Sequence, residues 1–130
     1  MLQPIRRVVT VHDGEGKAVV GFDGPARNVR VRKASGGLVS TLLWVTDETP
    51  ADISGRADRA DREIGVGPPT RGSAFRIVDF PPTEESALMD NAAVIREMGI
   101  SGGGAKAGDG TAGNEKRHPL MHRTRSIDYA

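Results

Sequence analysis

The sequence predicts a mainly β protein with one helix, and three features of the chain lead to this prediction. Short runs rich in valine, isoleucine and phenylalanine alternate with turns that contain glycine, proline or aspartate. One segment, residues 84–98, has apolar residues at helical spacing. The chain has 130 residues, of which 37% are hydrophobic and 4% aromatic, so its single domain is predicted to have a small aliphatic core.

Four of the predicted strands are short. Residues 5–11 and 18–22 flank residues 12–16, whose Asp-Gly dipeptide and following glycine are typical of a hairpin turn. Residues 28–32 alternate valine with polar residues, and residues 74–80 form a run that ends at two prolines.

Residues 38–46 form the longest predicted strand. The segment is bounded by glycines before it and by a Pro-containing turn after it, and Leu42, Leu43, Trp44 and Val45 follow one another within it. A continuous apolar run of this kind is typical of a strand that is covered on both faces. Trp44 is therefore predicted as a core residue or as the wall of a pocket.

The remaining segments are predicted as loops and one helix. Residues 47–72 are rich in glycine and proline and predict a long polar loop, in which the Ala-Asp-Arg repeat of residues 57–62 is interpreted as incidental. Residues 101–117 contain six glycines and no large apolar residue, which predicts a flexible linker.

The helix is predicted over residues 84–98. Thr83 is its expected N-cap, two glutamates follow in the first turn, and a glycine stands at residue 99, where a helix would end. The expected apolar stripe consists of Leu88, Ala92 and Ile95, flanked by Val94 and Met98.

Composition excludes several classes of function. The chain has no cysteine, so it has no disulfide, zinc ribbon, iron–sulfur cluster or thiol nucleophile. The net charge of +1 gives no indication of a nucleic-acid partner. Arg30, Arg32 and Lys33 could contact a phosphate but are interpreted as a solvated strand end. No apolar stretch is long enough for a membrane-spanning helix and no signal peptide is recognised, which predicts a cytoplasmic protein without a membrane partner.

Residues 118–130 contain the richest group of polar side chains. His118 and His122 are four residues apart, but Pro119 argues against the helix that would bring them together. In a strand, alternate residues share a face, so His122, Thr124, Ser126 and Asp128 would form one polar row. That row either lines a pocket, where His122 and Asp128 could bind a divalent metal, or faces solvent on an edge strand.

Several segments in this order resemble a subfamily of small single-domain cupins of bacteria and fungi. They are residues 6–10, 16–20, 41–47, 75–82 and 122–129. The resemblance implies a jelly-roll β-barrel whose interior pocket often holds a divalent metal as cofactor.

The cupin pattern implies roles for residues near the C-terminus. His122 takes the place of the first histidine of the first cupin motif, whereas Thr124 replaces the second histidine and Asp128 replaces the glutamate. The chain ends before the closing glycine of this motif and before the whole second motif, so an incomplete barrel is expected. His122 and Asp128 alone are too few ligands for a tight metal site.

Two functions follow from these observations. The first is a cupin-type module that binds a small molecule or performs metal-dependent chemistry. In this module His122 is the acid, base or ligand, and Asp128 is its orienting partner. Thr124 and Ser126 are further polar groups of the pocket, and Trp44 lies in its wall. The second is a non-catalytic fragment or interaction module whose sheet is completed by a partner, such as a second copy of the chain at a sheet edge. No catalytic residue is assigned in either case.

Overall fold

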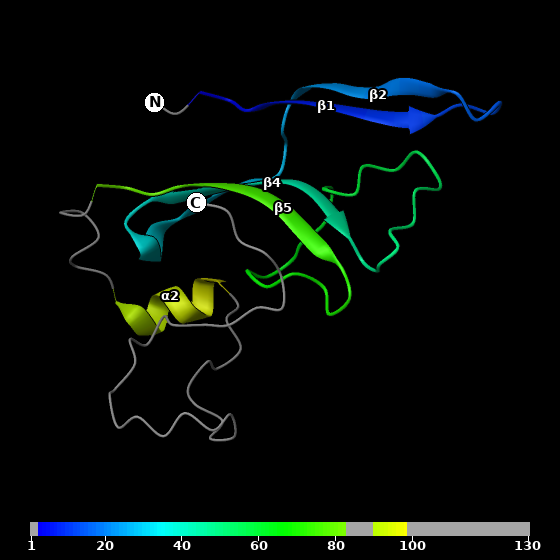
Figure 1. Cartoon of the computed structure of the whole chain (residues 1–130). Helices are drawn as coiled ribbons and strands as arrows, with labels where there is room; N and C mark the ends of the chain where they lie inside the picture. Colours follow the sequence, from blue (N-terminus) through cyan, green and yellow to red (C-terminus); the bar gives the residue numbers. More distant parts are fainter. Residues whose placement is uncertain (1–2, 83–89, 99–130) are drawn as a thin grey trace.

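The computed structural model describes residues 3–82 and 90–98, which form two antiparallel sheets and a helix (Figure 1). The elements are β1 (Arg6–His12), β2 (Ala18–Pro25), β3 (Val29–Arg32), the 3-10 turn η1 (Lys33–Ser35), β4 (Leu38–Thr46), β5 (Ser73–Asp79) and α2 (Asn91–Met98). The predicted mainly β class is confirmed for these residues. None of the helices in the described part of the chain is long and apolar enough to span a membrane.

Strands β1 and β2 form the predicted hairpin. The Asp13 carboxylate accepts hydrogen bonds from the backbone N–H groups of Glu15 (3.0 Å) and Lys17 (2.9 Å), and Gly16 has φ +78°, where a side chain would be strained. The aspartate and glycine therefore form the turn, as their residue types predict.

In Figure 1 the hairpin and α2 lie on opposite sides of the second sheet.

The second sheet has the order β3-β4-β5, with β4 in the centre. Six of the nine β4 residues are buried, which confirms the prediction of a covered strand. Cross-strand pairing assigns the sheet two faces, because directly paired residues lie on the same face. Arg30 pairs with Ser40, and Leu42 with Arg76, on one face. We call this the covered face, because the loop between β4 and β5 and helix α2 lie against it.

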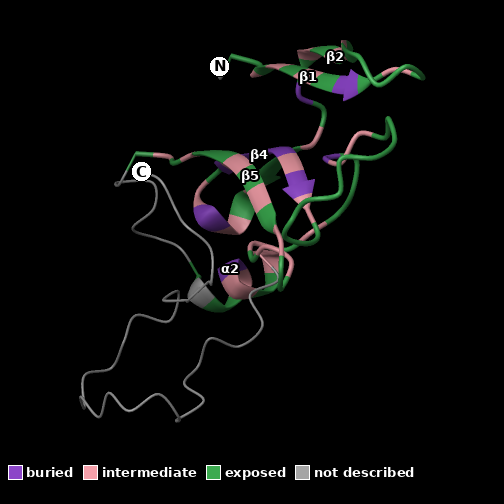
Figure 2. Ribbon diagram, turned by 45° about the vertical axis from the view of Figure 1, so that its right-hand side comes forward, coloured by how far each residue is buried: buried purple, intermediate pink, exposed green. Residues whose placement is uncertain are grey.

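Buried residues occur on β4 and α2 (Figure 2), and the small core lies at the covered face. Leu42, Val45 and the loop residue Ala60 are buried together, and Ile64 and Ala74 pack against them. The core is aliphatic, as the composition predicts. Val94 of α2 is a further fully buried side chain.

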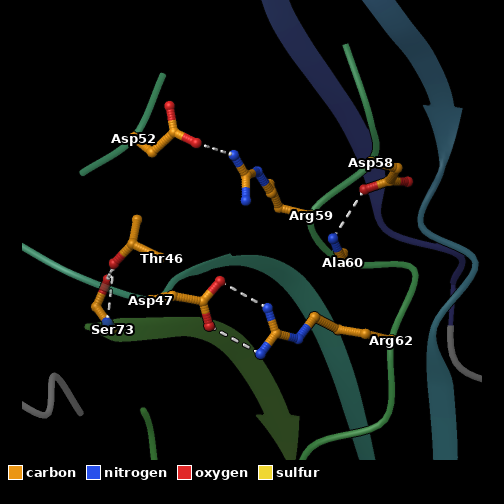
Figure 3. A network of polar contacts seen from close by, with 8 residues as sticks. All are labelled: Thr46, Asp47, Asp52, Asp58, Arg59, Ala60, Arg62 and Ser73. Carbon is orange, nitrogen blue, oxygen red and sulfur yellow. Dashed lines mark hydrogen bonds and ion pairs between the residues drawn. The ribbon is translucent and has the colours of Figure 1, made fainter. Parts of the chain in front are cut away.

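The predicted polar loop, residues 47–72, contains no helix or strand and is held by ion pairs (Figure 3). Arg62 donates two hydrogen bonds of 2.8 Å to the Asp47 carboxylate, and Arg59 donates one of 2.8 Å to Asp52. Asp58 is paired with Arg7 of β1. Three residues of the Ala-Asp-Arg segment, Asp58, Arg59 and Arg62, thus form the ion pairs of the loop.

Helix α2 differs from its prediction at its start and in its buried face. The Asp90 carboxylate accepts a hydrogen bond of 2.9 Å from the N–H of Ala92, which makes Asp90 the cap of α2 and not an internal helical residue. Ala92, expected on the apolar stripe, is exposed, and Val94 is buried in its place. Thr83 and Leu88, and the linker predicted over residues 101–117, lie outside the described residues.

Candidate functional site

Of the residues predicted for the functional site, the structure describes Trp44. His122, Thr124, Ser126 and Asp128 lie outside the described residues, so their predicted roles stay predictions. Trp44 is half-buried on β4, opposite Phe75 of β5. Both side chains belong to the sheet face that is opposite Arg76 and α2, which we call the open face.

A β-bulge places Trp44 on the open face. Pairing between β4 and β5 shifts by one residue between Leu42 and Trp44, so Leu43 is the extra residue. Without this shift, strict alternation from Leu42 would put Trp44 on the covered face. The bulge therefore determines which face has the single tryptophan of the chain.

Arg7 holds this bulge in place. Its Nη1 donates a hydrogen bond of 2.8 Å to the carbonyl oxygen of Leu43, an acceptor that a bulge removes from the regular ladder. The same guanidinium is paired with both carboxylate oxygens of Asp58 and lies over the Phe22 ring, 5.7 Å from its centroid. One side chain thus joins the hairpin, the bulge and the loop.

The open face is apolar, and the hairpin that lies on this side of the sheet leaves several of its side chains exposed. Val31 and Phe75 are 58% and 62% exposed, respectively, and Val29 and Ile77 are also exposed. The central residues Val39 and Trp44 are half-buried, and Thr41 is buried. An apolar surface that extends over all three strands of a small sheet is typical of a binding or packing face.

The described residues contain no group of three or more histidine, aspartate or glutamate side chains that could hold a metal ion. The proposed ligands His122 and Asp128 lie outside this part of the chain.

The covered face contains a second site, which the sequence did not predict. A small hollow that is open to solvent is lined by Asn28, Leu42 and Ile64 and by charged or hydroxyl side chains, namely Arg30, Arg32, Ser40, Arg62, Glu63 and Arg76. The interpretation of Arg30 and Arg32 as a solvated strand end is wrong for Arg32, which is half-buried and donates a hydrogen bond of 2.6 Å to the Glu97 carbonyl. The alternation of valine with arginine in residues 29–32 is the sequence signal for this site, because it places both arginines on the same face of the sheet.

The four arginines of the hollow differ in their partners. Arg30 is paired with Glu63, and Arg62 with Asp47, and these arginines lower the pKa values of both carboxyl groups by hydrogen bonding. Arg76 donates to the carbonyl oxygens of Val66 (3.0 Å) and Gly65 (2.9 Å). Burial lowers the pKa of the Arg76 guanidinium, and the neighbouring charge of Arg32 lowers it further.

Comparison with protein-family models and with curated proteins finds no match for this chain. The likeness to cupins therefore rests on the five sequence segments alone.

Proposed function

We propose that this chain is a cupin-type β domain that binds a small molecule against the open face of the β3-β4-β5 sheet. Trp44 and Phe75 form the apolar wall, and His122, Thr124, Ser126 and Asp128 supply the polar groups. His122 is the proposed acid, base or ligand, because imidazole changes its charge at physiological pH, and Asp128 is its orienting partner. A divalent metal is the cofactor that the cupin resemblance would add.

The open face itself is the observation that supports this proposal. Its residue Phe75 is 62% exposed, although burying an aromatic side chain stabilises a protein or complex by about 2 kcal/mol. The bulge at Leu43 and the contacts of Arg7 place a second aromatic residue, Trp44, on the same face. A structure that brings its tryptophan to a partly exposed apolar surface is suited to bind an apolar group there.

Phe75→Ser is expected to weaken binding of a neutral apolar ligand about tenfold, because it removes one aromatic wall of the face. The probe is N-phenyl-1-naphthylamine, and binding is followed by energy transfer from Trp44. Phe80→Ser is the matched control, since Phe80 is 78% exposed and lies just beyond the end of β5. Equal loss of binding in the two variants, or none in Phe75→Ser, would contradict the proposal.

A partner-binding module is the second candidate, and the edges of the sheet favour it. Within residues 3–82 and 90–98, β3 and β5 each pair with β4 alone, and β3 has the exposed valines Val29 and Val31. Apolar edge strands are typical sites for addition of a further strand. If probe binding falls as protein concentration rises and the chain sediments as a dimer, this second function is favoured over the first.

A further inference from the structure

The hollow on the covered face has more positive charge than its carboxylates compensate. Four guanidinium groups and one carboxylate line it, and Asp47 pairs with one of the four from outside. Arg30 and Arg62 have carboxylate partners, whereas no described carboxylate forms an ion pair with Arg32 or Arg76. Arg32 and Arg76 therefore have no ion-pair partner within the described residues.

Arg32 and Arg76 are held in place by main-chain carbonyl groups. Arg32 is fixed by the Glu97 carbonyl at the end of α2, and Arg76 by the carbonyls of Gly65 and Val66. Carbonyl groups orient a guanidinium but do not neutralise its charge. The two side chains are thus fixed beside each other before any anion arrives, which reduces the entropy cost of binding.

Arg76 also has an unused donor. Its Nε–H is buried and has no hydrogen-bond partner within the described residues. A buried donor without an acceptor destabilises a fold, and an uncompensated guanidinium does so further. An anion in the hollow would offset the charge of both arginines.

We propose that this hollow binds an oxyanion group, the phosphate or carboxylate of a small molecule. Guanidinium groups bind such groups with short, charge-assisted hydrogen bonds, and the Ser40 hydroxyl, which also lines the hollow, is a further donor. The enclosed space of the hollow is about 20 Å³, room for about one water molecule, so only the oxygen atoms of the anion enter it. The hollow therefore takes the charged group, and the rest of the molecule lies outside it.

This site is independent of the proposed pocket, because it lies on the other face of the sheet. The open face selects apolar groups by contact with Trp44 and Phe75, whereas the hollow selects charge through Arg32 and Arg76. Failure of either proposal leaves the other intact.

The test is a titration of the 130-residue chain with inorganic phosphate at constant ionic strength, followed by calorimetry and by the melting temperature. Phosphate is expected to bind and to raise the melting temperature, whereas chloride at equal ionic strength does not. Arg76→Gln and Arg32→Gln are each expected to weaken phosphate binding about tenfold or more. Arg6→Gln is the control with the same change of charge, because Arg6 is an exposed hairpin residue paired with Asp23.

A parallel titration with acetate separates the two ligand classes. Tighter binding of phosphate assigns the hollow to phosphate compounds, and tighter binding of acetate assigns it to carboxylates. Because Arg76 also anchors the loop, Arg32→Gln decides the result if Arg76→Gln does not fold. Phosphate and acetate effects no larger than that of chloride, or equal affinity in Arg32→Gln and the unchanged chain, would overturn the proposal.

Discussion

Arg7→Ala is expected to lower the free energy of unfolding by about 3 kcal/mol, because it leaves Asp58 partly buried without its counter-charge. The Arg7 and Asp58 side chains are 10% and 16% exposed, respectively, so solvent screens this pair weakly. The substitution also removes the donor to the Leu43 carbonyl and the contact with Phe22. Chemical denaturation followed by circular dichroism measures the loss.

Arg6→Ala is the matched control for this substitution. Arg6 is the neighbouring residue on β1 and also has an aspartate partner, Asp23, but both side chains are exposed. Exposed ion pairs contribute little to stability, so the control is expected to unfold like the unchanged chain. Similar losses in the two variants would contradict the role given to Arg7.

The effect of Arg7→Ala is expected to depend on pH. Hydrogen bonding to Arg7 lowers the pKa of the Asp58 carboxyl, so the paired carboxylate stabilises the fold fully above its unfolded pKa of about 4. This stabilisation is lost as the pH falls through the lower pKa of the folded state. The difference between Arg7→Ala and the unchanged chain should therefore shrink in acid, and a difference that stays constant would be inconsistent with this ion pair.

Gly72→Ala is expected to destabilise the protein by about 3 kcal/mol, because there is no room for a side chain at this position. A Cβ atom at residue 72 would lie 1.8 Å from the carbonyl oxygen of Thr46 and 2.8 Å from the carbonyl carbon of Asp47. These are backbone atoms and cannot rotate away. The strain would fall where the Ser73 N–H donates to the Thr46 hydroxyl (2.9 Å) and closes the loop between β4 and β5.

Gly67→Ala is the control within the same loop. A Cβ atom at residue 67 would meet nothing within 4 Å, so this substitution is expected to leave the melting temperature nearly unchanged. Thermal unfolding of the two variants side by side measures the difference. Equal melting temperatures of the Gly72→Ala and Gly67→Ala variants would show that the loop is not fixed against β4.

The parts of the fold that depend on local chemistry could be predicted from the sequence. The hairpin follows from Asp13, whose carboxylate accepts backbone hydrogen bonds in the turn, and from Gly16, which adopts the positive φ that the turn needs. Strand β4 follows from its continuous apolar run. The start of α2 was predicted less well. Thr83 and Asp90 are both capping residues by type, and the sequence does not rank them.

Features that depend on contacts between distant residues could not be predicted. The bulge at Leu43 needs Arg7, which is 36 residues away, and nothing in the sequence of β4 marks the extra residue. The pairing of Asp58 with Arg7 spans 51 residues, so the sequence of the loop alone does not indicate it.

The candidate site was predicted in part, for the same physical reason. Trp44 was identified from its apolar neighbours, but its face is set by the bulge and not by alternation. The arginine-lined hollow joins residues of three strands and the loop, so each arginine alone resembles an ordinary surface residue. The net charge of the whole chain is +1, so charge composition does not indicate this local cluster of arginines.

The central claim is that the open face of the β3-β4-β5 sheet is the ligand-binding face and that His122, Thr124, Ser126 and Asp128 line the same pocket. The most direct test is a two-dimensional NMR titration of the ¹⁵N-labelled chain with N-phenyl-1-naphthylamine. We expect the largest shifts at the amides of Trp44, Phe75 and Ile77 and at residues 122–128, with little change at Arg32 and Arg76. Shifts confined to the covered face, or unchanged amides at residues 122–128, would contradict this account.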